Sequence, residues 1–415
     1  MNLQDTAHAI HEAARRLQQV VRRTPLMRHE GLSQRYNCSV WLKREDLQVV
    51  RSYKLRGAYN LMSTLSPEQI QRGVVCASAG NHAQGFAWSC RKLGLHGIVF
   101  MPVITPRQKV SQTQMFGQDN IEVRLVGDTF DSCAAAAQEF AATQNKTFIP
   151  PFDHQRIIEG QGTVALEILD DLPQIDYLFV PVGGGGLSAG MGSYFKTFSP
   201  ATQIIGVEPL GAPAMYEALR AGQPITLETI DRFVDGAAVK RAGDLTFEHC
   251  QQVLDDLILA HEGLVCSTIL KLYAEDAIVV EPAGALSIAA LEQYEDQLAG
   301  KNVVCVVSGG NNDIDRMPEI KERALQYEGL KHYFIIRFPQ RPGALREFVV
   351  EVLGPDDDIV HFEYMRKNYR EAGPALVGIE FKQTGQLDRL QESMRSHHFS
   401  FDYLNGNSDL LRFLL

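Results

Sequence analysis

The chain has 415 residues and a formal net charge of −10 at neutral pH. This length exceeds what one hydrophobic core supports and predicts two or three domains. The net negative charge and the lack of a basic patch argue against a nucleic-acid partner. No apolar run approaches the roughly 20 residues of a membrane-spanning helix, so we expect no membrane partner either. The seven cysteines are scattered and form no CxxC pair, which indicates core residues of a reduced, cytoplasmic protein.

The first three quarters of the chain alternate between short β-branched runs and helical stretches. The strand-like runs cover residues 40–43, 74–77, 97–101, 122–126, 177–182 and 203–207. Strands that are apolar on both faces, with helices between them, predict an α/β fold with mostly parallel sheets. The span is long enough for two lobes. We therefore predict a domain over 1–320, with a smaller lobe of about 45–145 inserted in a larger one.

The last 85 residues change character after a charged helical linker, 321–330. Their pattern predicts the order strand, helix, strand, strand, helix, strand, which is a ferredoxin-like βαββαβ unit over 331–415. The paired His397 and His398 have no third residue at metal-ligand spacing, and no glycine run occurs here. We interpret this unit as a binding or regulatory module.

Lys54 is the first candidate for chemistry, in the run Arg51-Ser52-Tyr53-Lys54-Leu55-Arg56-Gly57-Ala58. It follows a predicted strand and precedes helical spacing over Tyr59–Leu65, so we expect it where a loop passes into a helix. The positive end of a helix favours an unprotonated, nucleophilic amine that forms a Schiff base with an aldehyde cofactor. A lysine taken alone is far more often a solvated surface residue, so this interpretation depends on other segments.

Three further loops each follow a predicted buried strand and open a helix, the arrangement that gathers ligand sites at one edge of a parallel sheet. The first, Ser78-Ala79-Gly80-Asn81-His82, offers backbone amides and side chains for a carboxylate, although Asn81 also suits an ordinary helix cap. The third, Ser308-Gly309-Gly310-Asn311, offers a hydroxyl for a ring nitrogen, and a helix cap explains Ser308 equally well.

The second loop, Gly183-Gly184-Gly185-Gly186-Leu187, indicates a phosphate site, because glycines let backbone amides approach a phosphate at a helix N-terminus. It is neither GxGxxG nor a P-loop. Glu208 nevertheless stands where a dinucleotide-binding acid would, so a nucleotide site stays open as a rival. Pyridoxal 5′-phosphate with an amino-acid substrate needs the groups that these segments offer together: an amine, a carboxylate site, a phosphate site and a hydroxyl. A dinucleotide would not use Lys54.

These motifs resemble the serine/threonine dehydratases among the tryptophan-synthase-β-like, fold type II pyridoxal phosphate enzymes, over roughly residues 5–320. The tail resembles the single ACT-like regulatory domain of short biosynthetic threonine dehydratases (threonine ammonia-lyases). Two departures occur, Tyr53 in place of the commoner phenylalanine and Val49-Val50-Arg51 in place of a proline-containing approach. The segments that carry the resemblance are Lys43–Leu47, Ser52–Ala58, Ser78–His82, Gly160–Thr163, Gly183–Gly186, Glu281–Ala285, Ser308–Asn311 and Phe338–Leu345.

The resemblance implies that Lys54 binds the cofactor as a Schiff base and then removes the substrate α-proton. Asn81 would hydrogen-bond the cofactor 3′-oxygen, and Ser308 its ring nitrogen. Backbone amides would hold the cofactor phosphate at Gly183, Gly184, Gly185, Gly186 and Leu187. The substrate carboxylate would be held by Ser78, Gly80, Asn81 and His82.

The resemblance further implies β-elimination of L-threonine, with L-serine as a secondary substrate, in isoleucine biosynthesis. Isoleucine, opposed by valine, would act at the tail, and a homodimer or homotetramer is expected. No metal is expected, because the partner positions of Glu208 are alanines, Ala212 and Ala214. Two alternatives stay open: a serine dehydratase or racemase of the same fold, and an amino-acid sensor without catalysis. Against racemisation, Ala79 has no proton to donate where racemases carry a serine.

Overall fold

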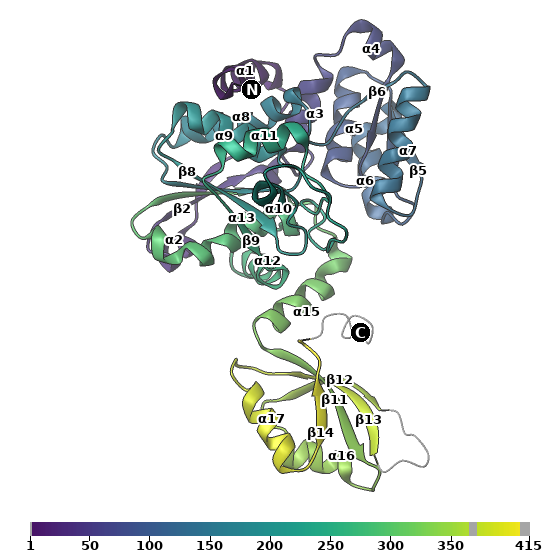
Figure 1. Ribbon diagram of the computed structural model, residues 1–415, viewed down its shortest axis with the longest axis vertical. Coiled ribbons are helices and arrows are strands. Elements are labelled where there is room, and N and C mark those ends of the chain that lie inside the picture. The colour runs from purple at the N-terminus through teal and green to yellow at the C-terminus, as the bar shows by residue number, and fades with distance from the viewer. Residues whose placement is uncertain (1, 365–371, 407–415) are drawn as a thin grey trace. The chain divides into compact units, whose positions relative to one another are not determined.

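The computed structural model describes residues 2–364 and 372–406 and divides the chain into two compact units, Met1–Ile314 and Asp315–Leu415 (Figure 1). The first unit contains two separate sheets, and the second contains one. No helix in the described ranges is long and apolar enough to cross a membrane.

The larger sheet of the first unit has the strand order β1-β2-β10-β7-β8-β9. Only the edge pair β1 and β2 is antiparallel, and the other neighbours are parallel. The strands are β1 (Leu26–Arg28), β2 (Ser39–Arg44), β7 (Tyr177–Pro181), β8 (Gln203–Pro209), β9 (Asp256–Ala260) and β10 (Asn302–Val307). The helices of this lobe are α1 (Leu3–Leu17), α2 (Glu30–Arg35), α8 (Gln155–Asp171), α9 (Gly186–Phe198), α10 (Ala214–Ala221), α11 (Asp244–Val253), α12 (Glu262–Asp276), α13 (Pro282–Ala289) and α14 (Glu295–Leu298).

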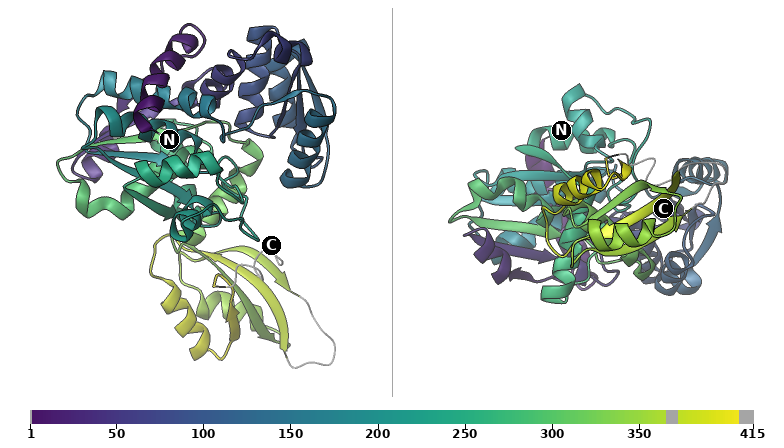
Figure 2. Two further views of the ribbon diagram at one scale, coloured as in Figure 1. Left: turned by 45° about the horizontal axis from the view of Figure 1, so that its top comes forward. Right: turned by 90° about the horizontal axis from the view of Figure 1, so that it is seen from below.

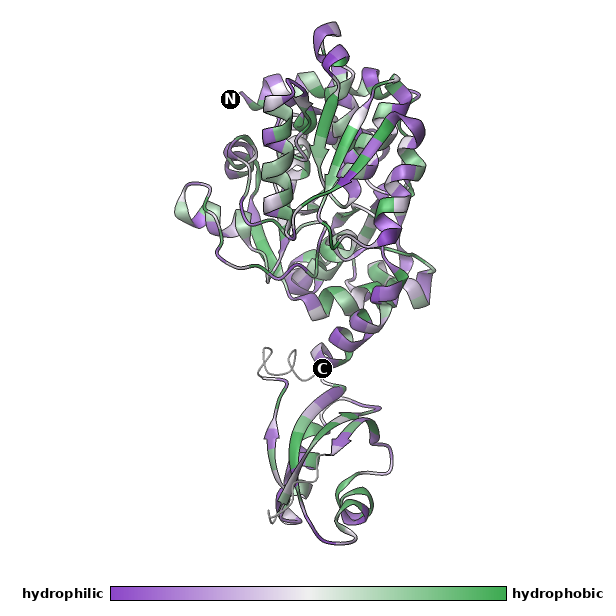
Figure 3. Cartoon of the chain, turned by 90° about the vertical axis from the view of Figure 1, so that its right-hand side faces the viewer, coloured by the Kyte–Doolittle hydropathy of each residue, from purple (hydrophilic) through white to green (hydrophobic). Residues whose placement is uncertain are grey.

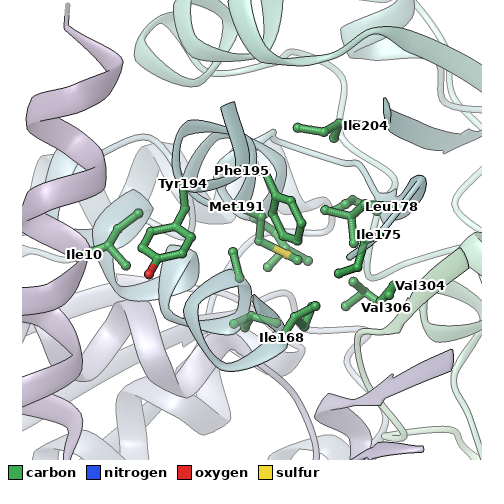
Figure 4. Close-up of a cluster of buried hydrophobic side chains, with 14 of the residues drawn as sticks. Ile10, Ile168, Ile175, Leu178, Met191, Tyr194, Phe195, Ile204, Val304 and Val306 are labelled. Atoms are coloured by element: carbon green, nitrogen blue, oxygen red, sulfur yellow. The ribbon is translucent and has the colours of Figure 1, made fainter. Parts of the chain in front are cut away.

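Helices cover this sheet and bury its apolar strands, as its sequence requires. In one large cluster, side chains of α1, α8 and α9 pack on β7, β8 and β10. Figure 4 shows Tyr194 and Phe195 of α9 between Ile10 of α1 and the strand residues. The central strand β10, Asn302-Val303-Val304-Cys305-Val306-Val307, is buried from Val303 onward because it has neighbours on both edges and helices on both faces.

The smaller sheet has the order β5-β4-β3-β6 and is parallel throughout. Figure 3 shows its apolar strands between helices, and separate apolar clusters lie on its two faces. Its strands are β3 (Val74–Ala77), β4 (Gly97–Met101), β5 (Ile121–Leu125) and β6 (Thr147–Phe148). The helices of this lobe are α3 (Lys54–Met62), α4 (Pro67–Arg72), α5 (Asn81–Leu93), α6 (Arg107–Gly117) and α7 (Phe130–Thr143).

The second unit begins with α15 (Met317–Tyr327), which occupies much of the expected linker, and continues into an antiparallel sheet of order β12-β13-β11-β14. Its last strand lies beside its first, and both helical segments pack on one face, as Figure 2 shows. The predicted α/β lobes and the βαββαβ order are confirmed. The elements are β11 (Lys331–Pro339), α16 (Ala344–Glu347) with a π-helical turn (Phe348–Val352), β12 (Asp358–Tyr364), β13 (Ala372–Glu380), α17 (Leu387–Ser396) and β14 (Ser400–Tyr403). The sequence pattern predicts the second strand of this unit over Ile359–Lys367, and residues 365–367 of that range lie outside the described residues.

Candidate active site

Lys54 is the first residue of α3, so the helix begins five residues before the predicted Tyr59. The reason is tertiary: the loop before it is hydrogen-bonded to the segment that follows β10. Tyr53 N donates to Ser308 O at 3.2 Å, and Gly310 N donates to Arg51 O at 2.9 Å. Arg51 has φ 59°, a left-handed conformation that costs a non-glycine residue energy, and the bonds to the β10 segment hold it there.

The side of α3 facing α5 is equally constrained. A Cβ on Gly85 of α5 would lie 3.0 Å from Leu55 N and 3.1 Å from Lys54 C, so only glycine allows this approach. The half-buried Lys54 places its Nζ 3.3 Å from Pro151 O and over the Tyr53 ring, 5.2 Å from the centroid. Its amine contacts no carboxylate among the described residues. The sequence and packing thus place the Lys54 amine at the start of α3, against the carbonyl group of Pro151.

The glycine run joins β7 to α9, and packing requires the first three of its four glycines. Gly185 has φ +90°, and a Cβ there would lie 2.6 Å from Met215 Cε. A Cβ on Gly184 would lie 2.3 Å from the Phe152 ring, and one on Gly183 would lie 2.8 Å from Ala237 O. Close packing therefore explains the run, beyond the phosphate approach that the sequence indicated.

The backbone amides of this run provide the test of whether a phosphate group fits. In the described ranges, the N–H groups from Gly183 to Leu187 donate to no protein acceptor, although four of these five residues are buried. Buried N–H groups require an acceptor, and the N-terminus of the 13-residue helix α9 adds a positive dipole. The residues present therefore fit an anionic group such as a phosphate.

The Ser78–His82 loop joins β3 to the N-terminus of α5, as expected. Ser78 Oγ accepts from Gly80 N at 3.2 Å, which shapes the loop, and a Cβ on Gly80 would meet nothing within 4 Å. Open space thus lies in front of the first amides of α5, where a carboxylate would be stabilised.

The ring of His82, the last residue of this loop, is hydrogen-bonded to another segment. The imidazole is buried and places Nε2 3.0 Å from Ile149 O, so that nitrogen carries the hydrogen. Burial, and then the charge of Lys54, lower the pKa of His82 to about 4. A neutral ring turned toward the core takes no part in proton transfer at neutral pH.

Asn81 and Ser308 lie on opposite lobes, and both are anchored. Ser308 Oγ is 3.3 Å from Ala283 O, while Asn81 Nδ2 donates to Glu281 Oε1 at 2.6 Å and Asn81 Oδ1 accepts from Asn311 Nδ2 at 2.7 Å. Sequence reasoning gave Glu281 no role, although a lone acid before an apolar Pro-Ala-Gly-Ala segment was the available signal.

Arg56, two residues after Lys54, is the second residue whose role the sequence interpretation missed. Its buried guanidinium bonds Glu45 at 2.8 Å and Glu167 at 2.7 Å, and Lys43 Nζ reaches Glu167 at 2.6 Å. These ions tie α3 to β2 and α8. The charged motif before Lys54 is therefore structural, and it fixes the helix that carries the amine.

Glu208, the acid that left a dinucleotide site open, is buried at the end of β8. Its two carboxylate oxygens accept from Met215 N at 2.9 Å and Tyr216 N at 2.8 Å, so it holds the first turn of α10. Burial raises the pKa of Glu208 to about 8. This carboxylate is engaged by backbone and is not presented to a ribose.

Comparison with known families gives two matches. Residues 17–309 match the pyridoxal-phosphate dependent enzyme family, and residues 322–414 match the C-terminal regulatory domain of threonine dehydratase. These matches exclude the dinucleotide alternative and support the cofactor that the motifs predicted.

Relatives extend the likeness over nearly the whole chain. It is 56% identical over 405 residues to L-threonine dehydratase biosynthetic IlvA of Bacillus subtilis (strain 168), covering 97% of this chain and 96% of that protein. The protein of the same name from Halalkalibacterium halodurans is 55% identical over 400 residues, covering 96% of each. The solved processed form of threonine deaminase isoform 2 from Solanum lycopersicum matches with a TM-score of 0.74 and 39% identity, covering 78% of this chain and 93% of that one. The chain belongs to the biosynthetic threonine dehydratase family of pyridoxal-phosphate-dependent enzymes.

Proposed function

We propose that this protein is a threonine ammonia-lyase, which converts L-threonine to 2-oxobutanoate and ammonia as the first step of isoleucine biosynthesis. One observation carries the proposal: a single lysine amine, Lys54, is held at the start of α3 in a chain with end-to-end likeness to threonine dehydratases. The β-hydroxyl leaves as water, and one water is taken up when ammonia is released, so the atoms balance.

Pyridoxal phosphate, when bound, withdraws electrons from the substrate Cα and makes its hydrogen acidic. We assign its covalent attachment to Lys54 Nζ and its phosphate to the amides of Gly183–Leu187. Asn81 is assigned to the ring 3′-oxygen, and Ser308 to the ring nitrogen. The phosphate assignment is supported by the backbone amides of this run, which donate to no protein acceptor in the described ranges.

The protein groups direct the reaction to elimination. Lys54 Nζ takes the α-proton, and the α5 N-terminus holds the substrate carboxylate through Ser78, Gly80 and the backbone of His82. Ser308 would hold the ring nitrogen with a neutral hydroxyl, which would not stabilise a proton there as a carboxylate would, and this favours elimination. Ala79 supplies no proton from the opposite side, so racemisation is not supported.

Lys54→Ala tests the chemistry. We expect purified wild-type protein to have a visible cofactor absorbance band, to become irreversibly labelled after borohydride reduction, and to release a 2-oxoacid from L-threonine. Lys54→Ala does not acquire the covalent label, and its turnover rate falls by about 10²–10⁴-fold. Lys196→Ala, which removes a lysine paired with Asp255, is the matched control and keeps both. A colourless, inactive wild-type protein contradicts the proposal and favours an amino-acid sensor.

The substrate preference depends on one methyl group, worth about 1–3 kcal/mol in an apolar pocket. We therefore propose turnover of both L-threonine and L-serine, with threonine preferred. Assays of kcat/KM with each substrate measure this ratio, and steady formation of D-serine contradicts the elimination assignment.

The remaining assignments concern regulation and assembly. We propose that isoleucine, opposed by valine, acts through the second unit, in a cytoplasmic homodimer or homotetramer. The match of residues 322–414 to a regulatory domain supports the first part. Threonine turnover that isoleucine leaves unchanged contradicts the regulation, and sedimentation as a monomer contradicts the assembly.

A further inference from the structure

A chain of hydrogen bonds crosses from the smaller lobe to the larger one through Asn81. Asn81 Nδ2 donates to Glu281 Oε1 at 2.6 Å, and its Oδ1 accepts from Asn311 Nδ2 at 2.7 Å. Asn311 Nδ2 also donates to Val50 O at 2.9 Å. Asn81 is the first residue of α5, whereas Glu281 precedes α13 and Asn311 follows β10.

The two ends of this chain decide which way the Asn81 amide is turned. Val50 O only accepts, so Asn311 must direct its NH₂ group there, and that same group then donates to Asn81. Asn81 consequently presents its oxygen to Asn311 and its NH₂ to Glu281, whose ionised carboxylate is also only an acceptor. One Nδ2 hydrogen is used by Glu281, and the second has no acceptor in the part of the chain that the structure describes.

The fold makes room for this contact at a specific glycine. A Cβ on Gly309 would lie 2.2 Å from Glu281 Oε1 and 3.2 Å from Asn81 Nδ2. Glu281 is only 5% exposed, and its backbone N donates to Gly309 O at 3.2 Å. Burying a carboxylate is costly unless it is hydrogen-bonded, so a merely structural cap would be served better by an uncharged residue.

We propose that Glu281 is a positioning residue of the active site, fixing the Asn81 amide so that its second Nδ2 hydrogen is kept for the cofactor ring oxygen. The inference rests on the proposed function, which assigns Asn81 to that oxygen. Glu281 itself acts through Asn81. Its removal leaves the Asn81 amide held only through its oxygen, by Asn311, and takes away the acceptor that fixes the direction of its NH₂ group.

Charged groups from three elements surround this carboxylate. Burial, and then Asp235 of the loop before α11, raise the pKa of Glu281 to about 7, while Asn81, Lys109 of α6 and Lys54 of α3 act to lower it. Charge-assisted hydrogen bonds are about twice as strong as neutral ones. The restraint on Asn81 is therefore strongest above pH 7, and it weakens when Glu281 gains a proton.

Three variants of the holoenzyme test the assignment without any substrate. We measure the cofactor absorbance spectrum from pH 5.5 to 9 and the dissociation constant for pyridoxal phosphate. Wild type shows a spectral transition near pH 7. Glu281→Gln keeps an acceptor for Asn81, loses this transition and binds the cofactor within about threefold of wild type. Glu281→Ala weakens cofactor binding about tenfold, as expected for the loss of one well-placed hydrogen bond.

Glu262→Gln is the matched control, because Glu262 is 8% exposed and accepts from Gly211 N at 2.7 Å. It keeps the wild-type transition. The decisive comparison places Glu281→Ala in an Asn81→Ala background, where its effect on cofactor binding should disappear. An undiminished effect there, or an unchanged pH transition in Glu281→Gln, overturns the proposal. Because threonine is absent from these measurements, they test the role of Glu281 even if the proposed activity toward threonine is wrong.

Discussion

His82 shows how a residue in the right motif can contribute something other than its side chain. It follows Asn81 in the loop predicted to hold a carboxylate, yet its ring is buried and donates to Ile149 O. With its pKa lowered to about 4, the folded protein keeps this ring neutral. In the unfolded chain the same histidine has an ordinary pKa near 6.5. Between pH 6.5 and 4 the unfolded chain therefore binds a proton that the folded protein does not.

The sign of the pH dependence follows from this difference. Above pH 6.5 neutral His82 makes its full contribution to the free energy of unfolding. That contribution is lost as the pH falls toward 4, by about 3 kcal/mol in all. We expect His82→Gln to flatten the fall in the free energy of unfolding between pH 6.5 and 4.5, measured by urea denaturation. His8→Gln, an exposed histidine, is the control and keeps the wild-type slope. An identical slope in His82→Gln would contradict the assignment.

The glycines of the site differ in what they tolerate, and this gives a second prediction. Gly184→Ala drives a methyl group into the Phe152 ring and distorts the amides assigned to the phosphate, whereas Gly80→Ala meets open space. We expect Gly184→Ala to be purified largely without cofactor. Gly80→Ala retains cofactor absorbance and raises KM for threonine, because its methyl group occupies the space in front of α5. Equal cofactor content in both variants would contradict this distinction.

At the scale of elements, the orientation of α3 depends on a buried ion network. Arg56 and Glu45 are both fully buried, and Glu167 lies against them from α8. Glycines make this crossing close, since a Cβ on Gly160 would lie 2.6 Å from Arg56 O. Lys54 is positioned by these contacts even though it takes part in none of them.

Removing Arg56 from this network leaves Glu45 buried without its hydrogen-bonded cation and leaves Glu167 paired with Lys43 alone. We expect Arg56→Leu to lower the free energy of unfolding by about 3–5 kcal/mol. Arg241→Ala removes an exposed pair with Asp244 and lowers it by only about 0–1 kcal/mol. Chemical denaturation of both variants compares the two effects, and equal losses would refute the structural assignment of the motif.

Sequence patterns predicted elements better than their junctions. The runs at 74–77 and 97–101 coincide with β3 and β4, because strands buried on both faces are continuously apolar. The start of α3 was missed because it is set by a bond from Tyr53 to Ser308, far along the chain. Lys54 and the glycine run carried local signals. The roles of Glu281 and Arg56 could not be assigned from local sequence, since their partners Asn81 and Glu167 lie 200 and 111 residues away.

At the scale of the whole molecule, each unit has its own apolar core, and the two family matches fall on separate units. We expect a protein ending at Ile314 to convert threonine and to have lost any response to isoleucine. Turnover with and without isoleucine, compared with the full chain, measures this. Loss of cofactor binding in the shortened protein would show instead that the second unit is needed to complete the first.

The position of β10 has a consequence for the order in which the protein is made. This strand lies between β2 and β7 in the larger sheet, yet it is the last strand of that sheet to be synthesised. Until residue 307 has left the ribosome, β2 and β7 each have an unpaired backbone edge, which is prone to pair with other chains. The smaller sheet, built from residues 74–148, is complete long before. Nascent chains that stall between these points would therefore need protection by chaperones, and the loop before Lys54 would still lack the β10 segment that holds it.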